Sequence, residues 1–241
     1  VTPRQECFMT NEQNKTTNLN LKGIFPGFDY DNTYHFKCFV NDMGEVHGGY
    51  SPLNDAHYNT QKTMQMFDAW YKENPLGIKP VVRVNYSDRC VNAFWQSGTV
   101  TTGSGNTDPN VDPDEIDMFC AGPDKLSHPL VAIDVIAHEI AHGVTEKFSD
   151  LFYNELQSGG LNESFSDMTA QVASFYSIGK NSWHIGDTIM ISPDVIRYMD
   201  DPEKDGKSIA HMKQLDKLVG DLDDPHYSSG IFNKAFYLLS S

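Results

Sequence analysis

The sequence predicts an α+β fold with a strand-rich first half and a helical second half. Residues 1 to about 50 are rich in Asn, Asp, Gly and aromatic residues and contain short alternating runs such as YHFKCFV, a pattern typical of strands and turns. From residue 130 onward, apolar residues recur at helical spacing. We therefore expect a strand-rich N-terminal lobe at 1–129 and a helical lobe at 130–241.

In the first half, the segment DAHYNTQKTMQMFDAWYKEN at 55–74 predicts a helix that ends near Pro75. KPVVRVNYS at 79–87 predicts a strand, and VNAFW at 91–95 is a second strand candidate. Residues 97–128 are rich in Gly, Asp, Pro and Thr and predict a long loop, a kind of segment that is often functional.

In the second half, apolar residues predict one helix over 130–147 and, after Ser-Gly-Gly, another over about 161–178. Residues 181–228 predict turns and short segments, and a last helix is expected from near Ser229.

Charge and hydropathy limit the classes of partner. The net charge of the 241 residues is −15, which argues against nucleic acid and anionic membrane surfaces, because both attract basic patches. No apolar run is long enough to cross a bilayer. We therefore expect neither a nucleic acid nor a membrane as a partner. We also expect a monomer.

Four cysteines indicate the redox compartment. Cys7, Cys38, Cys90 and Cys120 include no C-x-x-C pair, which excludes zinc ribbons and thioredoxin motifs. Of the three possible pairings we favour Cys7–Cys38 with Cys90–Cys120, because it closes two loops of similar size. This pairing implies an oxidising compartment, whereas four buried free thiols would be the cytosolic alternative.

The segment DVIAHEIAHGVTE predicts a metal site. His138 and His142 are four residues apart, so on a helix both side chains project from one face. Glu139 lies about 100° round the helix, where a base can take a proton from a metal-bound water. The simpler alternative is a helix with two ordinary histidines.

The second helix offers what a catalytic zinc site still lacks. Glu163, expected in the first turn, supplies a third ligand, and Asp167 can accept the outer N–H of a liganding histidine. Acidic residues near a helix start are also favoured by the helix dipole, but this does not explain their place one helix after H-E-x-x-H.

Six separated motifs resemble one family: YSPLNDAH, VNAFW, HEIAHGVTE, SGGLNESFSD, RYMDDP and HYSSGIFNKAFYLL. In this order they resemble the thermolysin-type secreted neutral metalloproteases, in the Gram-negative branch that contains pseudolysin and vibriolysin. The resemblance implies a zinc site in a cleft between the two lobes, a secreted bacterial protease made with a propeptide, and protein and peptide substrates. It also implies further strands before Cys7 and further helices after Ser241.

The resemblance implies roles for single residues. It gives the zinc ligands as His138, His142 and Glu163, the general base as Glu139, and the second-shell carboxylate as Asp167. It implies that His226 stabilises the oxyanion, oriented by Asp221, and that the substrate backbone is bound by Asn92, Ala93 and Arg197.

The sequence departs from the family in two places. Glu163 follows His142 by one residue more than expected, so counting places the oxyanion tyrosine at Asn154, whereas chemistry favours Tyr153. Of the expected calcium ligands only Asp134 is kept, and the acidic partners are replaced by Gln171, Ser174 and Ser182. Because calcium prefers several charged oxygens, we do not expect a tight calcium site here, although the acidic stretch DPNVDPDEID in the 97–128 loop could supply ligands.

The hypothesis is a zinc-dependent endopeptidase that cleaves on the amino side of large apolar residues, with Glu139 acting on a zinc-bound water. One alternative is a zinc aminopeptidase, which needs a carboxylate to hold the free amine of its substrate. Another is a zinc-stabilised binding module without catalysis, which needs a fourth protein ligand.

Overall fold

The computed structural model describes residues 6–19, 33–37, 52–85, 92–97, 114–117, 128–149, 151–191, 195–220 and 223–241. The chain forms two compact units, Val1–Ala132 and Ile133–Ser241. Strands predominate in the first unit and helices in the second, which confirms the predicted α+β class.

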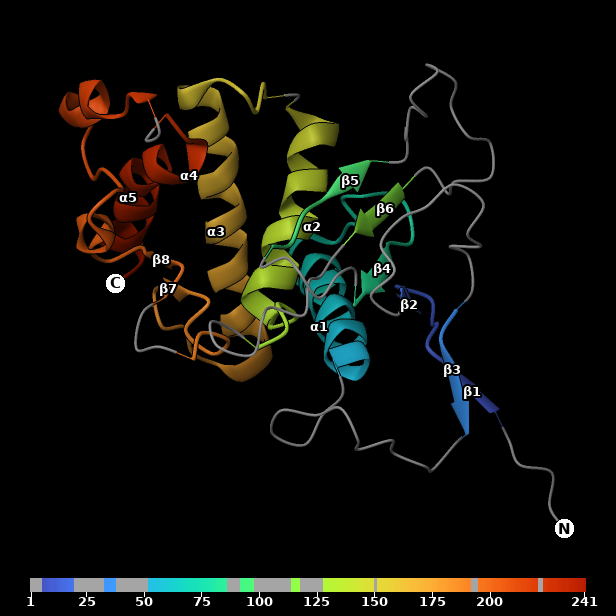
Figure 1. Cartoon of the computed structure of the whole chain (residues 1–241). Helices are drawn as coiled ribbons and strands as arrows, with labels where there is room; N and C mark the ends of the chain where they lie inside the picture. Colours follow the sequence, from blue (N-terminus) through green and yellow to red (C-terminus); the bar gives the residue numbers. More distant parts are fainter. Residues whose placement is uncertain are drawn as a thin grey trace, which may run out of the picture. The chain divides into compact units, whose positions relative to one another are not determined.

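The first unit contains a four-stranded sheet in the order β2-β4-β6-β5 (Figure 1). Strands β2 (Lys15–Asn18), β4 (Val81–Val84) and β6 (Asp114–Asp117) run parallel to one another, and β5 (Gln96–Ser97) pairs antiparallel with β6. A separate antiparallel pair joins β1 (Glu6–Phe8) to β3 (His35–Lys37).

One helix packs against this sheet. Helix α1 (Pro52–Met66) contacts β2 and β4 and continues as a π-helix over Phe67–Tyr71. It buries Leu53, Ala56, Met64 and Met66. All four residues of β4 are buried as well, as expected for a central parallel strand.

Within the predicted strands at 34–40 and 79–87, the structure confirms strands at His35–Lys37 and Val81–Val84. The helix predicted at 55–74 is confirmed by α1 and its π-helical continuation, which ends at Tyr71. The long loop predicted over 97–128 is wrong in one part, because 114–117 pair with two strands of the sheet. Its Asp and Glu residues disfavour strands, so the sequence pattern did not indicate β6.

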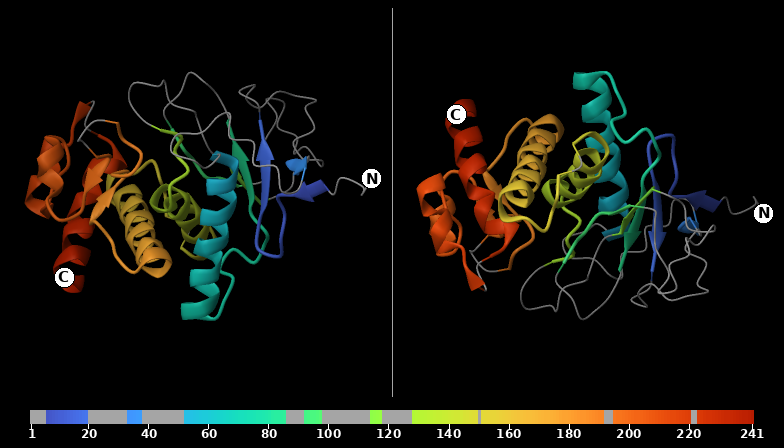
Figure 2. Two further views of the ribbon diagram at one scale, coloured as in Figure 1. Left: turned by 90° about the horizontal axis from the view of Figure 1, so that it is seen from below. Right: turned by 90° about the horizontal axis from the view of Figure 1, so that it is seen from above.

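The second unit is built on two adjacent helices, α2 (Ile133–Phe148) and α3 (Leu156–Ile178), which lie side by side in Figures 1 and 2. The short helix α4 (Pro225–Ser228) and the longer α5 (Gly230–Ser240) also contact α3. The hairpin of β7 (His184–Ile185) and β8 (Arg197–Tyr198) and two 3-10 helices, Pro202–Asp205 and Met212–Lys217, complete the unit. Ala170, Ile185 and Met199 form a buried apolar cluster between α3 and the hairpin, with Trp183 and Phe236 packed against it.

Helix α3 begins at Leu156, about five residues before the predicted start. Gly159 and Gly160 were expected to precede the helix, but both lie inside it and are buried. A Cβ at Gly159 would lie 2.1 Å from the carbonyl oxygen of Tyr153, and one at Gly160 would lie 2.1 Å from Oγ of Ser228. The glycines therefore allow close packing. Because the helix starts earlier, Glu163 is not in its first turn, and the helix-dipole explanation for this residue fails.

Among the helices of the described segments, none combines the length and the apolar character that crossing a membrane requires.

The packing of Gly159 can be tested by substitution. In an exposed helix, Gly→Ala stabilises by about 0.5–1 kcal/mol, but in Gly159→Ala the new methyl group meets backbone. We expect Gly159→Ala to lower the free energy of unfolding by about 1–3 kcal/mol, as overpacking does. Urea unfolding measures it, with Gln157→Ala at an exposed position of α3 as the control that should change by less than about 0.5 kcal/mol. A stabilised Gly159→Ala would contradict the close approach.

Candidate metal centre

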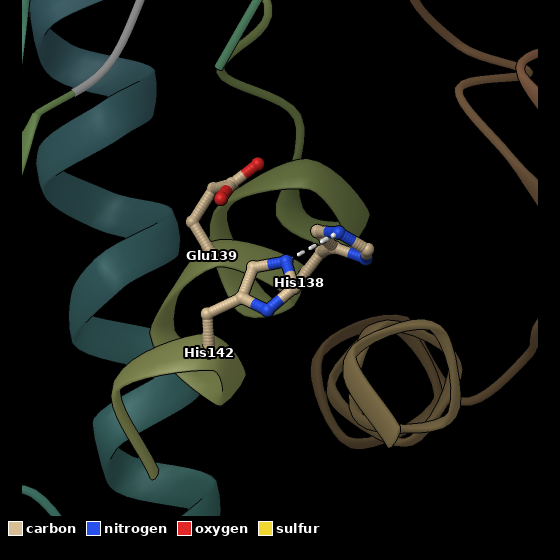
Figure 3. A group of neighbouring side chains, drawn as sticks. All are labelled: His138, Glu139 and His142. Atoms are coloured by element: carbon tan, nitrogen blue, oxygen red, sulfur yellow. Dashed lines mark hydrogen bonds between the residues drawn. The ribbon is translucent and has the colours of Figure 1, made fainter. Parts of the chain in front are cut away.

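Two imidazoles on successive turns of α2 face each other. His138 and His142 project from the same side of the helix, and their Nε2 atoms are 3.1 Å apart (Figure 3). His138 is buried and its ring lies edge-on to that of His142. The four-residue spacing of the sequence brings the rings together, as predicted.

The outer nitrogen of each ring is held by an oxygen acceptor. Nδ1 of His138 donates to Oδ1 of Asp167 at 2.9 Å, and Nδ1 of His142 donates to Oδ1 of Asn162 at 2.8 Å. When both rings are neutral, each carries its one proton on Nδ1, so both Nε2 atoms then present lone pairs. Two lone pairs at 3.1 Å repel each other unless a cation or a proton lies between them.

Glu163 on α3 brings a buried carboxylate to the same point. Its Oε2 lies 3.3 Å from Nε2 of His138, and its Oε1 lies 3.3 Å from Nε2 of His142. The carboxylate is fully buried, and Oε2 accepts no hydrogen bond from the described residues. Ligand atoms bound at about 2.0–2.1 Å round a tetrahedral zinc ion are about 3.3 Å apart, which is the spacing seen here.

The three residues therefore fit a zinc ion. Two imidazole nitrogens and one carboxylate oxygen are the donor set of a catalytic zinc site, which keeps its fourth position open. Glu139 lies in the same cluster, with a carboxylate oxygen within 4.8 Å of the histidine nitrogens. Figure 3 shows this carboxylate beside the histidine pair and not between the two rings. Glu163 is favoured as the third ligand because its two carboxylate oxygens lie 3.3 Å from the two Nε2 atoms.

The electrostatics of the cluster favour positive charge. Burial alone lowers the pKa of His138, but the carboxylates of Glu163 and Asp167 raise it to about 10. Burial in turn opposes ionisation of Glu163, yet the two histidines hold its pKa well below the usual range. A negative carboxylate thus faces the point where both imidazoles converge.

Asp167 is compensated by Arg197 of β8. The guanidinium forms two hydrogen bonds with the carboxylate, from Nη2 to Oδ1 at 2.6 Å and from Nε to Oδ2 at 2.7 Å. Burial of Asp167 raises its pKa, but the charge of Arg197 and the hydrogen bond from His138 lower the pKa further than burial raises it. Asp167 is therefore ionised and oriented at neutral pH.

Two exposed hydrogen-bond donors border the metal centre. The hydroxyl of Tyr153 donates to Oε1 of Glu163 at 2.7 Å, and Nε2 of His226 lies 3.4 Å from Oε2 of the same carboxylate. Tyr153 is 39% exposed and the His226 side chain 41% exposed, so both can meet a ligand from solvent. Residue counting indicated Asn154 as the oxyanion-binding position, but Asn154 is exposed. The side chain that contacts Glu163 is that of Tyr153.

Other residues singled out in the sequence are placed as follows. Asn92 is exposed and Ala93 forms a β-bridge in the first unit. Cys7 forms a disulfide. Outside the described residues lie Asp221, Cys38, Cys90 and Cys120.

The sequence reasoning missed two residues that orient site histidines. Asn162 precedes Glu163 and accepts from His142, and Asp224 accepts from Nδ1 of His226 at 2.6 Å. Asp224 is also the N-cap of α4, where its side chain accepts the backbone N–H of His226. An aspartate directly before a proline is a common helix start, and this signal was available in DDPH.

At the position where the family resemblance predicts calcium, hydrogen-bond donors of the chain bind the side-chain oxygens of Asp134 and Gln171. Oδ2 of Asp134 accepts the backbone N–H of Gly186 at 2.6 Å. The amide of Gln171 donates to the carbonyl of His184 at 2.9 Å and accepts the N–H of Trp183 at 3.1 Å. Both carboxylate oxygens of Asp134 and the side-chain oxygen of Gln171 thus already accept backbone N–H groups.

The two serines add no ligand. Oγ of Ser174 donates to the carbonyl of Ala170 within its own helix, and Oγ of Ser182 donates weakly to that of His184, at 3.3 Å. Calcium needs about six to eight converging oxygens. The residues present at this position therefore do not fit calcium, and direct hydrogen bonds join α2 and α3 to residues 182–186.

Two family profiles cover almost all of the chain. Residues 2–146 match the thermolysin metallopeptidase catalytic domain, and residues 149–241 match the thermolysin metallopeptidase alpha-helical domain. The junction between them lies in the last turn of α2, so the two histidines and Glu163 lie on opposite sides of it.

Individual proteins agree with this match. The chain is 37% identical over 240 residues to the "Neutral protease" of Vibrio proteolyticus, covering 98% of this chain and 35% of that protein. It is 38% identical over 251 residues to the "Zinc metalloproteinase MspA" of Legionella longbeachae, covering 98% and 42%. The chain thus spans well under half the length of these relatives.

One solved structure shares the fold. The precursor of protealysin, a metalloproteinase from Serratia proteamaculans, superposes with a TM-score of 0.68 at 24% identity, covering 96% of this chain and 70% of that one. This agreement supports the arrangement of strands and helices described above.

The calcium position can be tested by thermal unfolding at constant zinc, in calcium-free buffer and in millimolar calcium. We expect the same midpoint in both buffers for the unaltered chain, because the oxygens around Asp134 are occupied. Restoring charge with Gln171→Glu, Ser174→Glu and Ser182→Asp together should create a calcium response, worth about 2.7 kcal/mol at about 100 times the dissociation constant.

Asp134→Asn is the control for that experiment. A calcium-induced rise in the midpoint of the unaltered chain that Asp134→Asn removes would contradict the assignment. A rise that Asp134→Asn retains would come from calcium bound elsewhere.

Proposed function

Since the chain belongs to the thermolysin family of metallopeptidases, we propose that it is the catalytic part of a secreted zinc-dependent endopeptidase. Its substrates are proteins and peptides, cleaved on the amino side of large apolar residues. In the longer precursor its partner is a propeptide.

The observation that carries the proposal is the convergence of His138, His142 and Glu163. Two imidazole Nε2 atoms and a buried carboxylate oxygen without a hydrogen-bond partner surround one point. A binding module with structural zinc would need a fourth protein ligand. Tyr153 and His226, whose side chains contact Glu163 and are partly exposed to solvent, instead provide donors for a substrate.

Zinc bound at this point supplies a Lewis acid that polarises a peptide carbonyl and lowers the pKa of a water molecule. Glu139 lies beside the pair of histidines and is buried. Burial raises the pKa of this carboxyl group, against the lowering effect of the histidines. A carboxylate of this kind takes a proton from water as the carbonyl is attacked and then gives the proton to the leaving amine.

His226 and Tyr153 stabilise the negative charge that develops on the carbonyl oxygen. Because Asp224 accepts from Nδ1, the Nε2 atom of His226 is directed to the side of Glu163. The phenol of Tyr153 donates on the same side, and burial together with the charge of Glu163 raises its pKa, so it remains a proton donor. Donors placed in this way stabilise an oxyanion.

The substrate contacts are proposed from the family match. Asn92 and Ala93, which precede β5 in the chain, bind the substrate backbone, and Arg197 binds a substrate carbonyl. The guanidinium of Arg197 uses Nε and Nη2 for Asp167, which leaves Nη1 for a substrate oxygen.

An extracellular location is consistent with two observations. Cys7 is disulfide-bonded, and disulfides persist in oxidising compartments. One relative, 37% identical over 239 residues, is the "Virulence metalloprotease" of Vibrio anguillarum. We propose that this chain acts outside the cell.

Replacing the proposed base tests the function. Glu139→Gln keeps the size of the side chain but cannot accept the proton, so we expect zinc to stay bound and casein hydrolysis to fall by about 100- to 10,000-fold. Glu146→Gln, at an exposed position of the same helix, is the matched control and should keep full activity. If Glu139→Gln hydrolyses casein as fast as the unaltered chain, the proposed mechanism is contradicted.

Two further arms separate the competing activities. A zinc chelator should abolish hydrolysis, and added zinc should restore it. A peptide with a blocked N-terminus should be cleaved, because an endopeptidase does not need a free amine. Cleavage of unblocked peptides only would favour an aminopeptidase.

A further inference from the structure

The carboxylate of Asp167 has all its acceptor positions filled. Oδ1 accepts from His138 at 2.9 Å and from Nη2 of Arg197 at 2.6 Å. Oδ2 accepts from Nε of Arg197 at 2.7 Å and from Nδ2 of Asn233 at 2.8 Å. A carboxylate offers about four lone-pair sites, so these four donors fix both the position and the rotation of the group.

The fourth donor comes from a different helix. Asn233 lies on α5, far along the chain from the zinc-binding motifs, and is 1% exposed. Its Oδ1 accepts the hydroxyl of Ser164 at 2.7 Å, and Ser164 is fully buried next to Glu163 in α3. An ionised carboxylate only accepts hydrogen bonds, so Nδ2 must face Asp167 and the amide has one orientation.

This amide joins α5 to two positions of α3 that lie next to the metal centre. It accepts a hydrogen bond from Ser164, the residue that follows Glu163, and it donates one to Asp167, the residue that orients His138. Loss of the amide would leave one lone pair of Asp167 and the hydroxyl of Ser164 buried without partners. Asp167 could then rotate about its remaining bonds, and the tautomer of His138 would be held less firmly.

We propose that Asn233 is a positioning residue for the zinc site, coupling the packing of α5 to the affinity for the metal. The inference rests on the proposed zinc site. The inference goes beyond that site because it assigns α5 a part in metal binding. Helix α5 lies far from H-E-x-x-H in the sequence, so the sequence does not indicate this part.

A purely structural role for Asn233 is the alternative, and Gln171 provides the matched control. Gln171 is also a buried amide, is 1% exposed, and joins α3 to a neighbouring segment by one donated and one accepted hydrogen bond. Its partners are backbone groups of Trp183 and His184, and it has no hydrogen bond to Asp167. Both alanine variants should lose stability, but only one should lose zinc.

The experiment is competition for zinc between the folded chain and a chromogenic chelator, with unfolding by urea measured in parallel. Removal of a partner that orients a metal ligand weakens metal binding by about 10- to 100-fold. Asn233 acts through one intervening residue, so we expect Asn233→Ala to raise the zinc dissociation constant by about 10-fold, the lower end of that range. Gln171→Ala should raise it by less than about twofold.

Equal zinc affinity of Asn233→Ala and Gln171→Ala, at similar losses of stability, would overturn the inference. If Asn233→Ala does not fold, Ser164→Ala decides the same question, because it removes only the hydroxyl that holds Oδ1. It should weaken zinc binding in the same direction, and unchanged affinity would contradict the proposal. The readout is affinity, so an unaltered chain that binds zinc but cleaves no peptide would refute the proposed function and leave this comparison valid.

Discussion

Two buried carboxylates on one helix are the constraint around which the second unit is built. Glu163 and Asp167 are both fully buried on α3, and an ionised group in the interior is very costly unless charges or hydrogen-bond donors compensate it. Helix α2 supplies the histidines, β8 supplies Arg197, and α5 supplies Asn233. These three elements thus each bring at least one donor to the carboxylates of α3, and the oxygen of Glu163 that accepts no hydrogen bond from the described residues suits a metal ion.

The sequence was informative where function depends on local spacing. The four-residue interval between His138 and His142 predicted a shared helix face, and the structure brings their Nε2 atoms together. The interval from Glu163 to Asp167 placed two carboxylates one turn apart in the same way. Helical geometry is regular, so such pairs can be predicted from the sequence without knowledge of the fold.

The sequence was less informative where residues act through contacts between distant elements. Asn162 and Asn233 looked like ordinary polar residues, and only the packing of α3 against α2 and α5 gives them partners. The helix was expected to begin after Gly159 and Gly160. From the sequence alone, glycines that allow close helix packing cannot be distinguished from glycines that interrupt a helix. Strand β6 was missed for a related reason, since its pairing with β4 and β5 overrides the low strand propensity of its residues.

The most direct test of the central claim is X-ray absorption at the zinc edge of the metal-loaded chain. The account predicts two imidazole nitrogens at about 2.0–2.1 Å and oxygen ligands at about 2.0–2.2 Å, with no sulfur. His142→Ala should remove one imidazole from this shell. A spectrum with sulfur at about 2.3 Å, or one unchanged by His142→Ala, would show that zinc binds elsewhere and would contradict the account.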